Sequence, residues 1–141
     1  MSIDPHALPA RPAPAITPES QPYWDALREH RLVFQACGDC GRLRHYPRPL
    51  CDACYSTRVA WRQSRGRGRV HSWTIAHHPF HLAFKSLVPY PLVIVDMEEG
   101  VRVQAPWRGA TAALRLALPV EAVFERVSAD LILPAFVAAA G

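Results

Sequence analysis

The chain has 141 residues, half of them hydrophobic and a fifth charged, with a formal net charge of +4. This length fits one domain or two small ones, and the composition is ordinary for a globular protein. No apolar run approaches the roughly 20 residues that a membrane-spanning helix needs. The N-terminus lacks the basic and apolar regions of a signal peptide, so we expect a cytoplasmic protein with no membrane partner.

Proline dominates the start of the chain, where six of the 14 prolines lie within the first 22 residues. Because proline lacks a backbone N–H and restricts the residue before it, we expect an extended arm over about residues 1–17. A short helix is expected over residues 20–30, with Ser20 as its N-cap. Its apolar stripe packs either on its own domain or on a partner. The stripe consists of Tyr23, Trp24 and Leu27.

All four cysteines lie in two C-x-x-C pairs separated by ten residues. This spacing predicts a closed tetrahedral site of four thiolates that holds a structural Zn²⁺ ion. Gly41 follows the first pair and suits a tight turn with positive φ. Alternatives are an iron ion in the same site, two disulfides, or one redox-active C-x-x-C pair. Disulfides belong to oxidising compartments, and a redox function for one C-x-x-C pair would leave the second pair unexplained. The predicted ligands are Cys37, Cys40, Cys51 and Cys54.

Short segments lead into each cysteine pair. Residues 31–36 read as a strand before the first pair, and residues 46–50 lead into the second. Alternation of strand and C-x-x-C pair predicts a zinc ribbon over residues 31–62. So small a unit would obtain much of its folding free energy from the metal.

Positive charge is concentrated in the first half of the chain. Residues 1–69 carry eleven basic and six acidic side chains, whereas residues 70–141 carry five and six. Arginine binds phosphate bidentately, so the densest group of arginines is a candidate anion site, or else solvated surface. Along the stretch of chain that contains these arginines, Asp52 is the only acidic residue. The group consists of Arg42, Arg44, Arg48, Arg58, Arg62, Arg65, Arg67 and Arg69.

The pattern changes to strands after a glycine-bearing turn at residues 64–68. Alternating or continuous apolar stretches predict five strands, and no long helix separates them. Five strands in about 75 residues fit a small barrel such as the OB-fold. The predicted strands cover residues 70–76, 92–97, 101–105, 119–127 and 131–137.

The predicted fold is therefore mainly β. We expect an N-terminal helical arm over residues 1–30, a zinc ribbon over residues 31–62 and a five-stranded OB-fold barrel over residues 63–141. One connection inside the barrel, residues 77–91, is long and contains several large apolar side chains. Long loops are usually functional, and exposing these side chains would be costly, so we expect the loop to cover the barrel, a partner or a ligand.

Several segments together match one known family in order and spacing. They are residues 23–29, 32–41, 46–54, Trp61, 64–74 and 96–102. Over almost its whole length the chain thus resembles the acyl-CoA-associated proteins of the family called domain of unknown function number thirty-five. The resemblance implies an N-terminal helical arm, a rubredoxin-like zinc ribbon and a C-terminal OB-fold. One departure lies before the fourth barrel strand, where Ala117 replaces a glycine common in the family and affects the turn geometry.

The resemblance also implies a function. Proteins of this family look like non-catalytic accessory subunits of thiolase-like enzymes, hydratases or aldolases in acyl-CoA and lipid metabolism. Their OB-fold, and the groove between it and the ribbon, are implied to hold acyl-CoA. We expect the arm, the helix and the ribbon to bind the enzyme. The candidate ligand- or partner-binding residues are Arg65, Arg67, Trp73, Phe80 and Phe84.

Two other functions fit parts of the sequence. An OB-fold can bind single-stranded nucleic acid, and Trp73, Tyr90 and Trp107 are stacking candidates, although the basic residues lie mostly outside the barrel. An independent enzyme is the third possibility, but the chain has no G-x-S-x-G nucleophile motif. The candidate acids, bases and second-metal ligands are His71, His77, His78, His81, Asp96, Glu98 and Glu99.

Overall fold

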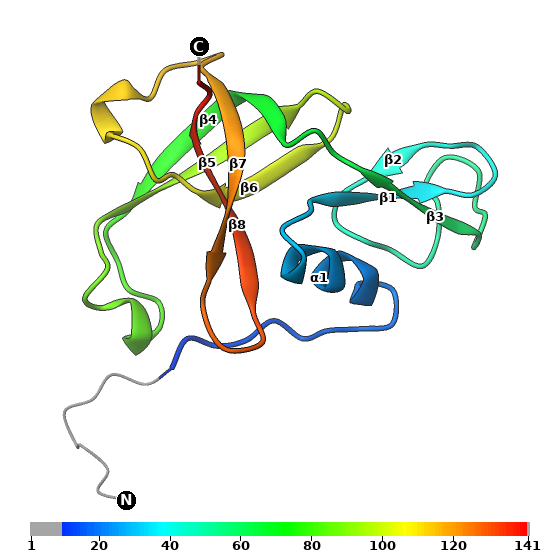
Figure 1. The fold of residues 1–141 in the computed structure, drawn as a ribbon, viewed down its shortest axis with the longest axis horizontal. Helices are drawn as coiled ribbons and strands as arrows, with labels where there is room; N and C mark the ends of the chain where they lie inside the picture. The colour runs from blue at the N-terminus through cyan, green and yellow to red at the C-terminus, as the bar shows by residue number, and fades with distance from the viewer. Residues whose placement is uncertain (1–9, 141) are drawn as a thin grey trace, which may run out of the picture.

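The computed structural model of the protein describes residues 10–140. The start of the predicted arm, residues 1–9, lies outside the described residues. Figure 1 shows an antiparallel ribbon beside a barrel, with one α-helix between them. The predicted mainly β architecture is confirmed. None of the helices in this part of the chain is long and apolar enough to cross a membrane.

The helix α1 (Gln21–Arg28) forms where the sequence predicts it, between the arm and the ribbon. Ser20 precedes it, but its side chain does not cap the helix; its Oγ accepts a hydrogen bond from Trp24 Nε1 at 3.2 Å instead. Tyr23 and Leu27 are buried, and α1 packs against the first ribbon strand and the last barrel strand. The apolar stripe therefore packs on its own chain and is not a free partner surface.

The ribbon is a three-stranded sheet in the order β2-β1-β3. The predicted first strand is confirmed, whereas residues 46–50 form no strand. The strand β3 was not predicted, because its side chains are mostly exposed and show no buried face. The ribbon strands are β1 (Val33–Cys37), β2 (Leu43–Arg44) and β3 (Val59–Gln63).

The barrel is a five-stranded sheet in the order β6-β5-β4-β7-β8. A parallel bridge between Trp107 and Phe136, with Arg108 N donating to Phe136 O at 2.9 Å, brings β8 beside the end of β6 and nearly closes it. This is the strand arrangement expected of an OB-fold. The barrel strands are β4 (Arg67–Ala76), β5 (Tyr90–Met97), β6 (Arg102–Pro106), β7 (Pro119–Arg126) and β8 (Ile132–Ala138).

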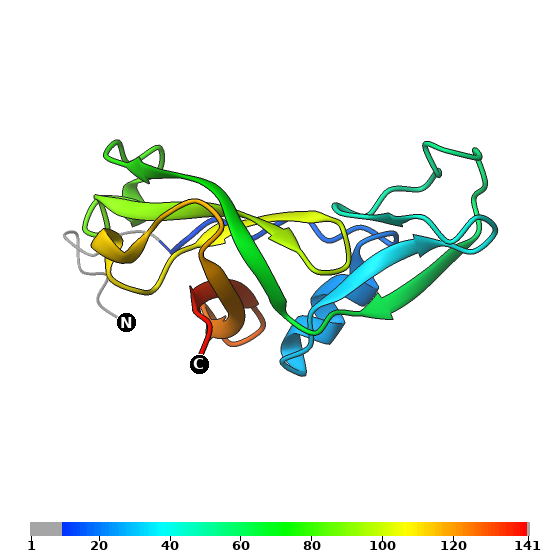
Figure 2. The ribbon, with the colours of Figure 1, turned by 90° about the horizontal axis from the view of Figure 1, so that it is seen from above.

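Ribbon and barrel share a single hydrophobic core. Leu27 and Phe34, on the helix and ribbon side, belong to the same cluster of buried side chains as Val93 and Phe136 in the barrel. Figure 2 shows the two lobes side by side, with the chain passing directly from β3 into β4. The chain is continuous in both backbone and core across this junction.

A close backbone contact sets the path of β4 where it enters the barrel. Gly68 pairs with Met97 on β5 and with Val120 on β7. A Cβ atom at Gly68 would lie 2.5 Å from the carbonyl oxygen of Asp96, so only glycine fits there. Gly66, just before it, has a φ of +73° and makes the predicted turn.

His45 packs among aromatic rings at the base of the ribbon. The ring centroids of Tyr23, Phe34 and Tyr46 lie 5.3, 5.6 and 4.1 Å from its own. Both of its ring nitrogens are buried, without a hydrogen-bond partner among the described residues. This burial lowers the pKa of His45 from 6.5 to about 4, so the folded protein keeps it neutral at pH 7.

We predict a stability loss in mild acid that depends on His45. The unfolded chain takes up a proton on His45 below about pH 6.5, but the folded chain does so only near pH 4. The free energy of unfolding therefore decreases as the pH falls between these two values. From pH 7 to pH 5 this group should lower the free energy of unfolding by about 2 kcal/mol. Urea unfolding at both pH values should show that His45→Phe removes this part of the loss. Equal losses in both proteins would contradict the prediction.

The turn before β7 contains the departure noted from the sequence. Ala117 has a φ of +63°, and its N–H donates to Val70 O at 2.8 Å. A left-handed conformation costs a residue with a Cβ roughly 1–2 kcal/mol. The turn keeps its geometry, and Ala117 is held in strain by the neighbouring hydrogen bonds.

We predict that Ala117→Gly raises the free energy of unfolding by about 0.5 kcal/mol, because relief of strain exceeds the entropy that glycine adds to the unfolded chain. The control is Ala110→Gly, at an exposed residue with a φ of −64°. It has no such strain to relieve and should lower stability. Chemical denaturation measures both, and stabilisation by neither variant would show that the turn is not strained.

Candidate functional site

Two matching turns bring the cysteines together. In the first, Gly41 N donates to Cys37 O at 3.0 Å, and in the second Tyr55 N donates to Cys51 O at 3.0 Å. Gly41 has the predicted positive φ of +76°, and Tyr55, at the equivalent position, has a φ of +62°. Each C-x-x-C pair is thus folded by the same local geometry.

The four Sγ atoms converge on one point. They lie within 4.8 Å of one another, with 3.5 Å between Cys37 and Cys54 and 3.6 Å between Cys40 and Cys51. A tetrahedral Zn²⁺ with Zn–S bonds of about 2.3 Å needs sulfurs about 3.8 Å apart. The thiols are free and far beyond disulfide bonding distance. The residues present therefore fit a four-coordinate metal with no open position.

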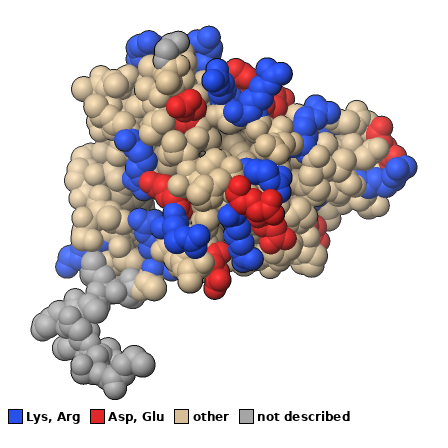
Figure 3. Space-filling view, in the orientation of Figure 1, with Lys and Arg blue, Asp and Glu red and all other residues tan. Residues whose placement is uncertain are grey.

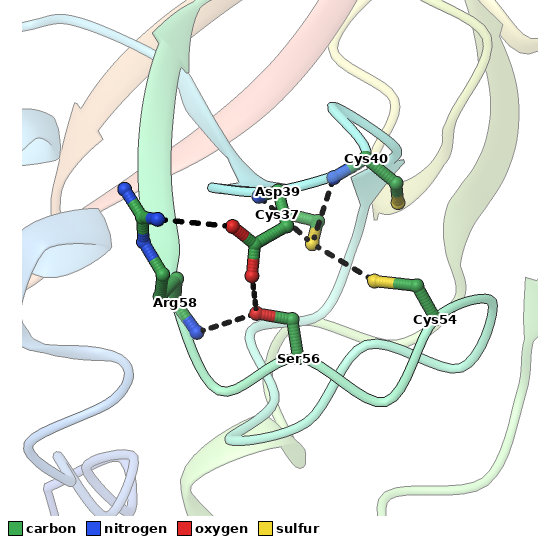
Figure 4. A network of polar contacts seen from close by, with 6 residues as sticks. All are labelled: Cys37, Asp39, Cys40, Cys54, Ser56 and Arg58. Carbon is green, nitrogen blue, oxygen red and sulfur yellow. Dashed lines mark hydrogen bonds and ion pairs between the residues drawn. The ribbon is translucent and has the colours of Figure 1, made fainter.

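Backbone amides lower the pKa of one thiol in each turn, Cys37 in the first and Cys51 in the second. Cys40 N and Asp39 N each donate to Cys37 Sγ at 3.4 Å, as Figure 4 shows in part. These amides lower the pKa of Cys37 to about 6. The amides of Cys54 and Ala53 likewise lower the pKa of Cys51. Metal binding requires deprotonated sulfur, so both turns favour it.

Two acidic residues beside the cysteines form ion pairs with arginines of the predicted cluster. Asp39 forms an ion pair with Arg58 at 3.1 Å and also accepts from Ser56 Oγ (Figure 4). Asp52 pairs with Arg42 at 3.4 Å. These two arginines are therefore paired within the two turns, which they help to orient, and do not form an open anion site.

A third arginine of the cluster is buried. Arg44 is 6% exposed and donates to Gln35 Oε1 and, at 3.1 Å, to Arg48 O. Gln35 Oε1 also accepts from Arg48 N at 2.7 Å. The guanidinium thus fastens the 44–48 loop to β1, so the eight arginines do not form one continuous patch.

The predicted ligand or partner residues divide into two groups along β4. Arg65 and Arg67 lie at its start, whereas Phe80 and Phe84 lie in the loop after its end. Nine residue steps at about 3.3 Å separate the strand ends by about 30 Å. Trp73 lies between the groups and is 38% exposed. The structure therefore does not gather these five residues into one compact site.

Several side chains differ from their expected roles. Trp107 is 2% exposed and donates from Nε1 to Ala110 O at 3.1 Å, so it cannot stack on a base. Glu99 is not a free turn residue, because its carboxylate accepts from Ser64 Oγ at 2.8 Å and from Arg65 N at 3.1 Å. Over residues 10–140, the four cysteines are the only group placed to hold a metal. No second metal site forms from the loop histidines there.

A groove at the start of β4 joins two arginines of the predicted cluster to a third that the sequence did not connect with them. Arg67 and Arg69 face this groove, which also contains Arg115, 46 residues beyond Arg69 in the chain. Beside them, Asp96 binds Arg102 Nε at 2.6 Å and His71 Nδ1 at 3.0 Å. The hydrogen bond from Arg102 holds the pKa of Asp96 below its usual range. No local motif joins these residues, because the barrel alone brings them together.

The closed four-sulfur centre on a three-stranded ribbon, joined to a five-stranded barrel, defines a zinc-ribbon and OB-fold protein. A family model described as "ChsH2, rubredoxin-like zinc ribbon domain" matches residues 24–60. A second, described as "ChsH2, C-terminal OB-fold domain", matches residues 61–125. The chain belongs to this ChsH2 family, also called DUF35, and the resemblance seen in the sequence is confirmed.

Similar proteins have been described from bacteria and archaea. A "Probable enoyl-CoA hydratase alpha subunit" of Thermomonospora curvata is 36% identical over 127 residues, which are 89% of this chain and 39% of that protein. A "DUF35 domain-containing scaffold protein" of Pyrococcus furiosus is 39% identical over 79 residues, 55% of this chain and 57% of that protein. The chain thus spans about two-fifths to three-fifths of these relatives.

A solved structure shares the whole arrangement. The structure described as "Ltp2-ChsH2(DUF35) aldolase" superposes with a TM-score of 0.81 at 34% sequence identity. The match covers 89% of this chain and 98% of that chain. Proteins similar to this chain are thus named as a hydratase subunit, a scaffold protein and an aldolase.

We predict that Cys37→Ser removes the bound metal and unfolds the ribbon, because three thiolates cannot close the site and metal binding supplies folding free energy. Asp39→Asn is the matched control, since it breaks the exposed pair with Arg58, worth less than about 1 kcal/mol, and keeps all four thiols. Elemental analysis and circular dichroism measure both effects. One equivalent of metal in purified Cys37→Ser would contradict the assignment.

Proposed function

We propose that the protein is a cytoplasmic, non-catalytic accessory subunit that docks on a thiolase-like enzyme, a hydratase or an aldolase and binds its acyl-CoA. The metal in its ribbon is a structural Zn²⁺. The observation that carries the proposal is a set of exposed large apolar side chains on β4 and the loop after it. We call this set the apolar patch: Trp73, Ile75, Phe80, Leu82 and Leu87.

The apolar patch is unusually exposed. Phe80 is 90% exposed, and Leu82 and Leu87 are 64% and 42% exposed. These three side chains of the loop therefore do not cover the barrel, which was one of the three possibilities that the sequence left open. Large exposed apolar groups that lie close along the chain mark protein interaction sites. An enzyme partner that covers them would recover the hydrophobic free energy.

The loop that carries the patch is held in place. His81 Nδ1 accepts from Ala83 N at 3.1 Å and caps the short 3₁₀ helix η1 (Leu82–Phe84). Phe84 is half-buried, with the guanidinium of Arg11 5.3 Å from its ring centroid and the ring of Tyr90 6.0 Å away. A loop fixed in this way loses less conformational entropy on binding than a mobile one. The arm thus supports the proposed docking surface.

The charge around the patch indicates the kind of partner surface. From His71 to Val95 the chain contains no aspartate or glutamate, but it contains Lys85 and four histidines. Charges across interfaces are usually complementary, so an apolar surface with an acidic rim fits best. The same argument disfavours a second copy of this surface as the partner.

The proposed acyl-CoA contacts remain those expected from the sequence. Arg65 and Arg67 at the start of β4 would face the charged part of the ligand, and Trp73, Phe80 and Phe84 its apolar part. Separation of the two groups along β4 suits an extended ligand better than a compact one. The assignment as a non-catalytic subunit draws support from the relatives named as scaffold proteins.

Co-expression with the acyl-CoA enzymes of neighbouring genes tests the docking surface. Native mass spectrometry should show a complex, and Phe80→Asp with Leu82→Asp should weaken it at least about tenfold, because charges would enter the interface core. Tyr55→Asp, on the ribbon at a residue that is 73% exposed, is the control and should leave the complex intact. Loss of binding by Tyr55→Asp alone would place the interface on the ribbon instead.

A further inference from the structure

We propose that the groove at the start of β4 binds the phosphate groups of an organic phosphate ester. This basic groove has a volume of about 780 Å³ and lies between the start of β4, the end of β5, residues 115–118 and the C-terminal segment 138–140. In Figure 3, several blue side chains lie along the upper edge of the molecule, with red side chains among them. The volume is typical of a small-molecule site.

Three guanidinium groups in the groove are available to a ligand. Within residues 10–140, Arg67 and Arg115 have no carboxylate oxygen within 4.0 Å, and Arg69 donates only to Ala117 O, at 3.3 Å. All three side chains are exposed. Arginine presents paired N–H donors that match phosphate oxygens, so unpaired guanidiniums around one groove fit an anion with several oxygens.

The acidic residues of the groove are arranged to leave these arginines free. Asp96 pairs across the sheet with Arg69, yet its two oxygens bind Arg102 and His71 instead. Arg102 thereby compensates the one carboxylate that could bind Arg69. Glu98 is the other acid in the groove, and it has no cation within 4.0 Å among the described residues. A bound phosphate would therefore be repelled by Glu98 alone.

One wall of the groove is apolar and sets the class of ligand. Leu116 is 68% exposed there, and residues 138–140 are all alanine. Inorganic phosphate would leave this wall uncovered, whereas an ester whose carbon-containing part extends from its phosphates would cover it. The chemistry thus fits a ligand with two or more phosphoryl groups and an apolar extension.

This inference deepens the acyl-CoA part of the proposed function, and the choice of coenzyme A as a ligand for the test rests on that proposal. Calorimetry of the full, zinc-loaded chain would compare coenzyme A, inorganic pyrophosphate and an oligoglutamate peptide. We expect coenzyme A to bind most tightly, pyrophosphate more weakly and the peptide least. The affinity for coenzyme A should fall as the salt concentration is raised.

Variants of the groove make the test specific. Arg67→Gln with Arg115→Gln should weaken coenzyme A binding about 100-fold, because each arginine contributes a charge-assisted hydrogen bond. Arg62→Gln, an exposed arginine on β3 outside the groove, is the matched control and should change little. Glu98→Gln should tighten binding by removing the uncompensated repulsion. This gain cannot be explained by misfolding.

Three results would overturn the inference. They are equal affinity in the Arg67, Arg115 double variant and the wild-type chain, tighter binding of the peptide than of coenzyme A, and no binding of either phosphate compound. Capture of the enzyme partner by the same double variant separates this question from the docking surface. A double variant that keeps its partner but loses coenzyme A supports the groove and leaves the docking proposal standing.

Discussion

The rest of the molecule depends on the close approach of three neighbouring strands at Gly68, a point that we call the crossing. Here β4 pairs with β5 and β7 at once, and the missing side chain lets it pass within contact of the Asp96 carbonyl. On one side of this crossing the chain continues back into the ribbon as β3. On the other side β4 leaves β7 and runs along β5 alone. The basic groove forms at the crossing, and the apolar patch forms where the strand ends.

The ribbon depends on a different constraint, the convergence of four sulfur atoms. Its sheet is small, and β3 has hardly any buried side chains. Its one well-buried strand, β1, packs beneath α1, while the two turns carry paired aspartates and arginines. These exposed pairs contribute little free energy each, so they orient the turns and leave the stability to the metal. The metal site thus stabilises the ribbon at one end, and the packing of β1 against α1 stabilises it at the other.

Structural features that depend on residues close together in the sequence could be predicted. Features that depend on residues far apart in the sequence could not. The cysteine spacing, the strand alternation and the turn glycines are local, and each matches the structure. β3 was missed because an exposed strand leaves no periodic pattern. The basic groove was missed because Arg115 reaches Arg67 only through the barrel. The arginine cluster was overestimated, since Asp39 lies outside it in sequence but pairs with Arg58 in space.

The shared hydrophobic core has a consequence for how such a protein can be rearranged. Leu27 and Phe34 lie in the same cluster as Val93 and Phe136, so a cut between ribbon and barrel would expose apolar surface on both halves. The boundary near residue 60, where one family model ends and the next begins, therefore does not coincide with a break in the hydrophobic core. Recombination that exchanges one half would have to repack this seam. Shuffling of the two lobes as an intact block is the route that preserves the fold.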